Sequence, residues 1–382
     1  MPVVRSVLAL TNVIKKHASH LGFTLAGVTS PDPPEGFARF EAWLQDGCHG
    51  DMAYLASDRS RDRRADPRRI LPACRSILVL ATAYKPAHTP AVDPTEAHIA
   101  AYALGRDYHL TLLDRMQQLI ARIESLAGNT IQAAAYTDTG PILERELAQR
   151  AGLGWIGRNS MLIHPEHGSH LFLSEILLDL DLQPDAAFED DLCGSCQRCI
   201  EACPTGCIRD DRTLDARRCI SYLSIEKRGC IPEEMRPAMG NHLFGCDICQ
   251  DVCPWNRRFG TLTTDPAFEP QPGRLKPMLS DLLTLNPARW RAPYVESPLL
   301  RAKRAGLVRN AAIVAGNGKH ADDIPSLGHA LLQDPAPVAR SHAAWALGQI
   351  GGNRSRHFLE RAADSEEDRT VLNAIHRALL SF

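Results

Sequence analysis

The sequence predicts an α+β protein in three consecutive parts: a layered sheet-and-helix domain, a cysteine-rich segment and a helical tail. Three observations lead to this division. Helical and buried-strand patterns alternate over residues 1–185, ten of the 12 cysteines fall between Cys193 and Cys253, and a helical motif near residue 310 recurs near residue 342. With 382 residues, 44% of them hydrophobic, the chain is long enough for two or three domains.

The first part, residues 1–185, alternates helices with strands. Apolar spacing predicts helices over residues 3–20, 37–55 and 108–126, and strands over 76–84, 131–137 and 172–180. Because helices separate the strands, we expect a layered core. The first helix carries Arg5, Lys15 and Lys16, so we expect an amphipathic helix rather than an export signal, and a cytoplasmic protein. No segment approaches the ~18 apolar residues of a membrane span.

The middle part, residues 186–260, has the cysteine spacing of two-cluster ferredoxins. One run is C-x2-C-x2-C-x3-C-P and the other is C-x2-C-x3-C-P, and in such pairs one cysteine of each run crosses to the other cluster. We therefore expect a ferredoxin-like domain with two [4Fe–4S] clusters. Cluster 1 takes Cys193, Cys196, Cys199 and Cys253; cluster 2 takes Cys203, Cys219, Cys246 and Cys249. Cys207 and Cys230 are the alternatives to Cys219. Structural zinc is the competing interpretation, but zinc sites have longer gaps between ligand pairs.

The last part is a proline-bearing connector over residues 261–300 and a helical tail over residues 301–382. In the tail the motif that begins at Asn310 is echoed 32 residues later at His342, with alanines at the close contacts. This period predicts a short HEAT-like repeat that serves as a docking surface. The alternative is an ordinary helical cap.

Two short motifs leave the second cofactor open. The glycines at 152, 154 and 157 have G-x-G-x-x-G spacing, but they follow a predicted helix, which argues against a dinucleotide site. Asp107 and His109 begin a D-x-H-x-x-G cobalamin signature, yet Leu112 stands where the glycine belongs.

Longer stretches resemble one family, the epoxyqueuosine reductases. These stretches are Arg64–Pro67, Tyr102–His109, Asp138–Arg145, Ala151–Ser160, Leu214–Leu223 and Gly245–Asn256. The resemblance implies an oxidoreductase of queuosine biosynthesis that reduces epoxyqueuosine to queuosine at the wobble position of tRNA, the final step of that route. It also implies base-off cobalamin, reduced through the two clusters. By this resemblance the candidate cobalamin contacts are Tyr102, Asp138, Ser160, Ser221, Cys246 and Asp247.

The resemblance implies that Asp138 is the proton donor. Asp138 follows a predicted strand, where loops commonly carry functional residues, and an acid for a departing oxygen needs a pKa raised by a dry, apolar pocket. The alternative is that Asp138 caps the helix that Pro141 begins. We expect Glu144 and Arg145 to form a helical ion pair or a structural clamp.

A tRNA partner requires a local basic surface, because the formal net charge is only −2. The candidate phosphate contacts are Lys227, Arg228, Arg301, Lys303 and Arg304, with Arg309 nearby; the arginine-rich run 59–69 fits a solvated helix face better. A small electron-donor protein or reductase is the other expected partner, and a monomer is sufficient. The competing functions are a reductive dehalogenase-like reductase of a small molecule and a non-enzymatic electron-transfer module.

Overall fold

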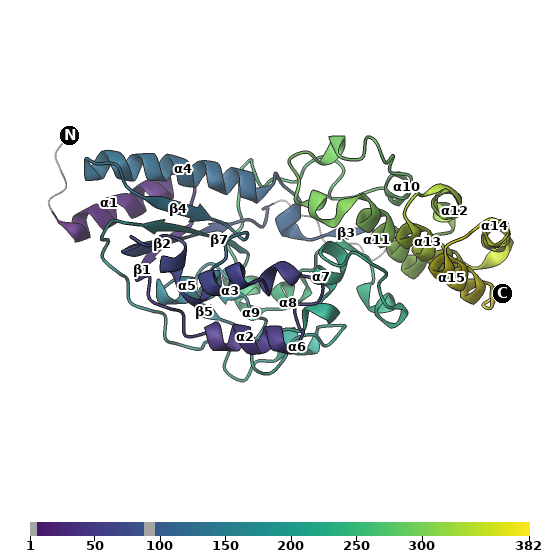
Figure 1. Ribbon diagram of the computed structural model, residues 1–382, viewed down its shortest axis with the longest axis horizontal. Coiled ribbons are helices and arrows are strands. Elements are labelled where there is room, and N and C mark those ends of the chain that lie inside the picture. The colour runs from purple at the N-terminus through teal and green to yellow at the C-terminus, as the bar shows by residue number, and fades with distance from the viewer. Residues whose placement is uncertain (1–5, 88–95) are drawn as a thin grey trace. The chain divides into compact units, whose positions relative to one another are not determined.

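The computed structural model describes residues 6–87 and 96–382 (Figure 1). It divides into two compact units that interleave along the chain. Unit 1 contains residues 1–87, 106–215 and 248–269, and unit 2 contains residues 88–105, 216–247 and 270–382. The boundaries expected from sequence are instead consecutive. The cysteine-rich segment therefore contributes residues to both units.

Unit 1 is built on a four-stranded sheet. Its strands are β1 (Leu25–Thr29), β2 (Ser76–Ala83), β7 (Leu171–Leu178) and β4 (Ala133–Tyr136), in that order, and every neighbouring pair is antiparallel. The three predicted strands correspond to β2, β4 and β7. Strand β1 was not predicted, because it is only five residues long and contains a glycine.

Helices cover both faces of this sheet. Helices α1 (Val7–His20) and α4 (Tyr108–Ala127) lie on one face and α5 (Glu144–Arg150) lies on the other (Figure 1). Helix α2 spans Phe37–Gln45 and α3 spans Asp58–Ala65. The prediction that α2 continues to residue 55 is wrong, because Gly47 turns the chain out of the helix with a left-handed φ of 65°. The part of the predicted first helix before residue 6 lies outside the described residues.

Short elements hold the cysteine-rich part of unit 1. Strands β5 (Trp155–Ile156) and β6 (Leu162–Ile163) form a hairpin, and the helices are α6 (Arg198–Glu201), α8 (Ile248–Asp251) and α9 (Pro254–Phe259). The glycines at 152, 154 and 157 follow α5 and lead into this hairpin. Trp155 is buried and packs with Ile163 and Cys253, so it is a core residue.

Unit 2 joins a small β-pair to a helical array. Strand β3 (His98–Ile99) pairs in parallel with β8 (His242–Phe244), and α7 spans Ile220–Ile225. The array contains α10 (Leu279–Leu283), α11 (Lys303–Gly318), α12 (Ile324–Gln333), α13 (Pro337–Ile350), α14 (Gly352–Ala363) and α15 (Arg369–Leu379). This arrangement confirms the predicted helical tail.

Arg309 and Asn310 of α11 are buried polar residues that donate hydrogen bonds to backbone carbonyls far away in the sequence. The Arg309 guanidinium donates to the carbonyl oxygens of Leu223, Lys227 and Gly229, at 2.6–3.0 Å. The Asn310 amide donates to the carbonyl oxygens of residues 224 and 243 at 2.7 and 2.9 Å. Because buried backbone acceptors need donors, α11 fixes the segment around α7.

Candidate functional site

Asp138 follows β4 in a left-handed conformation, with φ of 60°, that few non-glycine residues adopt. Its Oδ2 accepts a hydrogen bond from the Tyr108 hydroxyl at 2.9 Å and lies 3.3 Å from His109 Nε2. Helix α5 begins later, at Glu144, without a side-chain cap, so the helix-cap interpretation of Asp138 is wrong. The Asp138 side chain is 64% exposed, so the surrounding residues do not by themselves form the expected dry pocket.

His109 links two carboxylates in this loop. Its Nδ1 lies 2.7 Å from Asp107 Oδ1, while Nε2 faces Asp138. Burial lowers the pKa of His109, but the hydrogen bonds to Asp107 and Asp138 outweigh it and raise that pKa to about 9. The two carboxyl groups therefore favour the protonated form of the ring. Sequence reasoning considered His109 only as part of an incomplete cobalamin signature and did not single out Tyr108, although both lie in a stretch that carries the resemblance.

The first two residues of α5 clamp two backbone segments. Glu144 Oε1 accepts a hydrogen bond from the Asp138 amide at 2.6 Å, and Arg145 donates to the Ser160 carbonyl oxygen at 2.5 Å. Burial, followed by the charge of Asp138, raises the pKa of Glu144 to about 8. Ser160 is also left-handed, with φ of 63°, and its hydroxyl donates to the Arg212 carbonyl. Of the two expected roles, the structure assigns these side chains that of a clamp.

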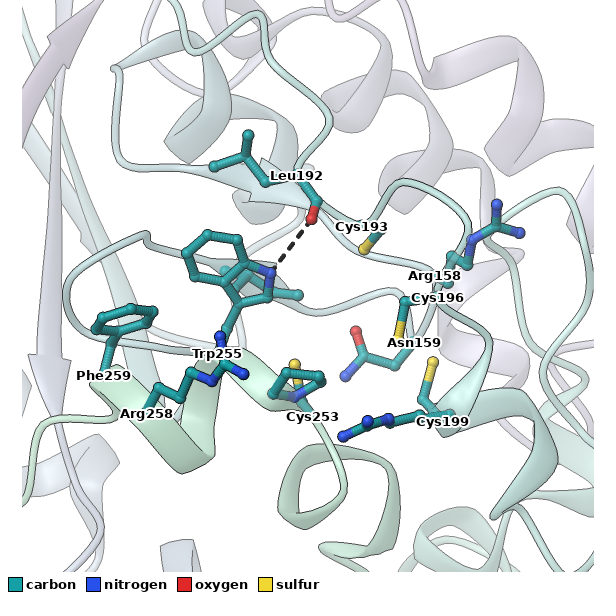
Figure 2. A pocket seen from close by; sticks show the side chains of 13 residues that line it. Arg158, Asn159, Leu192, Cys193, Cys196, Cys199, Cys253, Trp255, Arg258 and Phe259 are labelled. Carbon is teal, nitrogen blue, oxygen red and sulfur yellow. Dashed lines mark hydrogen bonds between the residues drawn. The ribbon is translucent and has the colours of Figure 1, made fainter.

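Four cysteines in unit 1 line one cavity of about 230 Å³ (Figure 2). They are the four predicted ligands of cluster 1: Cys193, Cys196, Cys199 and Cys253. Cys199 belongs to α6, and Cys253 immediately precedes α9. A cavity lined by four thiols fits the thiolate ligation of a [4Fe–4S] cluster. The Trp155 indole donates a hydrogen bond to Cys193 Sγ at 3.4 Å, and such bonds tune cluster potentials.

The predicted ligands of cluster 2 are divided between the units, Cys203 and Cys249 in unit 1 and Cys219 and Cys246 in unit 2. Cys207 is buried, and its Sγ lies 3.5 Å from Cys203 Sγ. Cys230 is half-buried in unit 2, with its Sγ 4.0 Å from Ser341 Oγ.

Four of the predicted cobalamin contacts, Tyr102, Ser221, Cys246 and Asp247, belong to unit 2, and three of them lie near Gly245. Tyr102 follows β3, while Cys246 and Asp247 follow β8. A Cβ on Gly245 would lie 2.5 Å from Ala100 Cβ and 3.3 Å from the Tyr102 ring, so only glycine allows this close approach. The Gly245 amide donates to Ser224 Oγ on α7, the helix that also carries Ser221. Asp247 is buried and accepts from the Ala101 amide at 2.6 Å.

The predicted basic surface is only partly available. Arg228, Arg301 and Lys303 are exposed, and the Arg301 guanidinium donates to Glu226 Oε1 at 2.7 Å. The prediction for Arg304 is wrong, because its buried guanidinium makes two hydrogen bonds to Asp334, at 2.6 and 2.7 Å. Arg309 is also buried. The sequence does not reveal these partners, which lie far away in the chain.

Arg304→Ala is expected to lower the free energy of unfolding by about 3–5 kcal/mol, because it leaves Asp334 as a buried charge without its partner. The exposed Arg301→Ala variant is the control, with an expected loss of about 0–1 kcal/mol. Denaturant unfolding monitored by circular dichroism measures both. Equal losses in the two variants would contradict the structural role of Arg304.

Three segments of the chain match known families. Residues 192–256 match the 4Fe-4S double cluster binding domain, residues 64–139 match epoxyqueuosine reductase QueG, and residues 298–380 match HEAT repeats. The HEAT-like interpretation of the tail is thus confirmed. No helix in the described ranges is both long enough and apolar enough to cross a bilayer.

Curated relatives and solved structures agree with these matches. The epoxyqueuosine reductase of Pseudomonas aeruginosa is 37% identical to this chain over 90% of the chain and 95% of its own length. That of Escherichia coli K12 is also 37% identical, over 92% of the chain and 92% of its own length. A crystal structure of epoxyqueuosine reductase with an epoxyqueuosine-modified tRNA-Tyr stem loop superposes with a TM-score of 0.90 at 31% identity, covering 98% of this chain and 99% of that one. A structure of the Bacillus subtilis epoxyqueuosine reductase superposes with a TM-score of 0.88 at 29% identity, covering 98% of this chain and 100% of that one. In that structure an aspartate-bearing catalytic loop is swung out of the active site.

Proposed function

The chain belongs to the epoxyqueuosine reductase family, and from this membership we propose that it reduces epoxyqueuosine to queuosine at the wobble position of tRNA. It is an oxidoreductase with a double [4Fe–4S] domain. The observation that carries the proposal is Asp138, held at the end of β4 by Tyr108 and His109. Because tRNA is the substrate, we expect the protein to act in the cytoplasm.

We propose that Asp138 gives its proton to the epoxide oxygen as that oxygen leaves. The loop has the donors to orient the carboxyl, namely the Tyr108 hydroxyl and the His109 ring. Its exposure in the absence of substrate allows the modified base to reach it, and a base bound there would exclude water from the carboxyl. In this proposal, the dry pocket expected from sequence forms when the bound base covers Asp138.

The second cofactor in this proposal is cobalamin, held base-off as the family resemblance implies; Leu112 in place of the glycine of the D-x-H-x-x-G signature is consistent with this. When bound, cobalamin supplies a low-potential cobalt centre for breaking the carbon–oxygen bond. The residues proposed to hold it are Tyr102, Ser221, Cys246 and Asp247 of unit 2 and Asp138 and Ser160 of unit 1. Gly245 lets the segment that carries Cys246 and Asp247 approach Ala100 and Tyr102 closely, which brings three of these residues near one another.

The proposed ligands of cluster 1 are Cys193, Cys196, Cys199 and Cys253, which share a cavity. For cluster 2 we propose Cys203, Cys219, Cys246 and Cys249 from their spacing alone. A small electron-donor protein or reductase supplies the electrons. The exposed cations Arg198 and Arg258 and the exposed Phe259, all at the cluster 1 cavity, favour an acidic donor. A monomer remains the expected state.

For tRNA, we propose phosphate contacts from Lys227, Arg228, Arg301 and Lys303. Replacing Arg228 and Lys303 together by Gln should weaken binding of the tRNA stem loop and reduce the slope of log K against log salt concentration by about 0.7–0.9 for each phosphate that is no longer neutralised. A salt titration of fluorescence anisotropy measures this slope. Arg354→Gln, an exposed cation on α14, is the control. An unchanged slope in the double variant would assign the RNA surface to other residues.

Anaerobic purification and a turnover assay test the proposed function as a whole. We expect about eight irons per chain, as two four-iron clusters require, together with bound cobalamin. Epoxyqueuosine-containing tRNA should then be converted to queuosine-containing tRNA with a chemical reductant. Turnover of halogenated aromatics but not of this tRNA would instead support the dehalogenase-like alternative.

A further inference from the structure

The glycine-rich stretch over residues 152–157 has no role in the proposed function so far, yet it leads into the wall of the cluster 1 cavity. Its strand β5 pairs with β6, with Trp155 opposite Ile163. Gly154 has a φ of 132°, and a Cβ there would collide with the Ile163 carbonyl oxygen, so only glycine fits. Ile163 lines the cavity. The glycine therefore brings Trp155 close to the cavity wall.

The Trp155 side chain is buried, at 1% exposure, and its single polar atom faces a sulfur. The indole N–H donates to Cys193 Sγ at 3.4 Å, although the two residues are 38 positions apart in the chain. The ring stacks on Phe188, with 5.7 Å between centroids, and meets Trp255 edge-on at 5.1 Å. An indole N–H can only donate, and a buried one usually has a partner. Here that partner is a proposed cluster ligand.

Two other hydrogen bonds hold the loop that carries Cys193. Arg158 Nη2 donates to the Gly194 carbonyl oxygen at 3.0 Å, and the Cys193 amide donates to Asp191 Oδ1 at 3.1 Å. Neither bond involves the indole, so both remain when the indole is replaced. The effect specific to the Trp155 bond is therefore electrostatic, because of these three bonds it alone ends on the sulfur.

A hydrogen bond to a ligand sulfur changes how easily a [4Fe–4S] cluster is reduced. Reduction adds one electron, taking the cluster from [4Fe–4S]²⁺ to [4Fe–4S]⁺, while no bond forms or breaks. The added charge makes the thiolate sulfurs better hydrogen-bond acceptors. A donor at such a sulfur therefore stabilises the reduced form more than the oxidised form and raises the reduction potential.

We propose that Trp155 raises the reduction potential of cluster 1 through its hydrogen bond to Cys193, which makes this cluster easier for the external donor to reduce. The inference rests on the proposed function, in which Cys193 is a cluster 1 ligand and the donor supplies the electron. Trp155 is a positioning residue, because it acts on the cluster through Cys193. The glycine-rich stretch thereby gains a role as the support of this donor.

The test measures the midpoint potential of cluster 1 in the anaerobically purified holoprotein, by a redox titration followed by electron paramagnetic resonance. Trp155→Phe keeps an aromatic ring but has no N–H. We expect a roughly tenfold smaller equilibrium constant for reduction, which is a potential about 59 mV lower for one electron. Cluster 2 in the same sample is the internal reference and should keep its potential.

Trp255→Phe is the matched control. Trp255 lines the same cavity, but its indole donates to the Leu192 carbonyl oxygen at 3.3 Å, as Figure 2 shows. This variant loses an indole from the same aromatic cluster and no hydrogen bond to sulfur, so the cluster 1 potential should equal that of the wild type. Equal shifts in Trp155→Phe and Trp255→Phe would overturn the proposal, because packing rather than the N–H would then set the potential.

A second replacement separates the hydrogen bond from packing at a buried site. Benzothienylalanine at position 155 has sulfur in place of the indole N–H, so it keeps the size of the ring and removes only the donor. We expect the same fall in potential, and a wild-type potential in this loaded protein would overturn the inference alone. If Cys193→Ser kept all of its iron, Cys193 would not be a ligand, and both the ligand assignment of the proposed function and this inference would fail.

Discussion

Asp138→Ala is expected to lower the turnover of epoxyqueuosine in tRNA by about 10²–10⁴-fold, the range over which a positioned proton donor contributes. The variant removes the carboxyl that Tyr108 and His109 orient, while the cluster-binding cysteines are untouched. Iron content should therefore equal that of the wild type, and the five other proposed cobalamin contacts should keep cobalamin bound. Liquid chromatography of nucleosides from digested tRNA measures the conversion.

Two further variants separate proton donation from structure. Asp138→Asn keeps the shape and an oxygen acceptor for Tyr108 but has no acidic proton, so we expect a loss of similar size. Asp114→Ala removes an exposed carboxylate from α4 and should leave the rate unchanged. Wild-type turnover by Asp138→Asn would show that another group protonates the oxygen.

Cys253→Ser is expected to reduce the iron content from about eight to about four atoms per chain and to abolish turnover, because cluster 1 loses a thiolate. Cys253 lines the cluster 1 cavity beside the three clustered cysteines that begin at Cys193, and it is itself buried. Iron analysis and electron paramagnetic resonance of the reduced protein report the loss directly. Cys48→Ala, at a buried cysteine outside the cysteine-rich segment, is the control and should keep all of its iron.

The same assay decides the eighth ligand. Cys219→Ser should lose about four irons, whereas Cys207→Ser and Cys230→Ser should keep about eight. Loss of iron in Cys207→Ser would instead make Cys207, whose Sγ lies 3.5 Å from Cys203 Sγ, the eighth ligand. It would leave cluster 1 as proposed.

The sequence was informative where the determinants are local. The predicted ligands of cluster 1 follow from cysteine spacing, which is a property of short stretches. All four of these cysteines line one cavity. Strands β2 and β7 were predicted because a strand buried on both faces is a continuous apolar run. The helical tail was predicted because its repeat recurs at a fixed period.

Sequence reasoning failed where distant segments meet. His109 gains its charge from Asp107 nearby and from Asp138, 29 residues away, so its role depends on the fold. Arg304 resembles a surface cation until Asp334 is placed against it.

Arg309 and Asn310 make the helical tail necessary for the structure of the cysteine-bearing segment. These side chains supply the donors for five backbone carbonyls of residues 223–243, a stretch that lies between Cys219 and Cys246. Truncation of the chain before α11 would remove the donors of these five carbonyl oxygens. The helical repeat therefore stabilises the cysteine-bearing segment of the same chain. If the repeat were removed for use as a separate RNA-binding module, that segment would lose these hydrogen-bond donors.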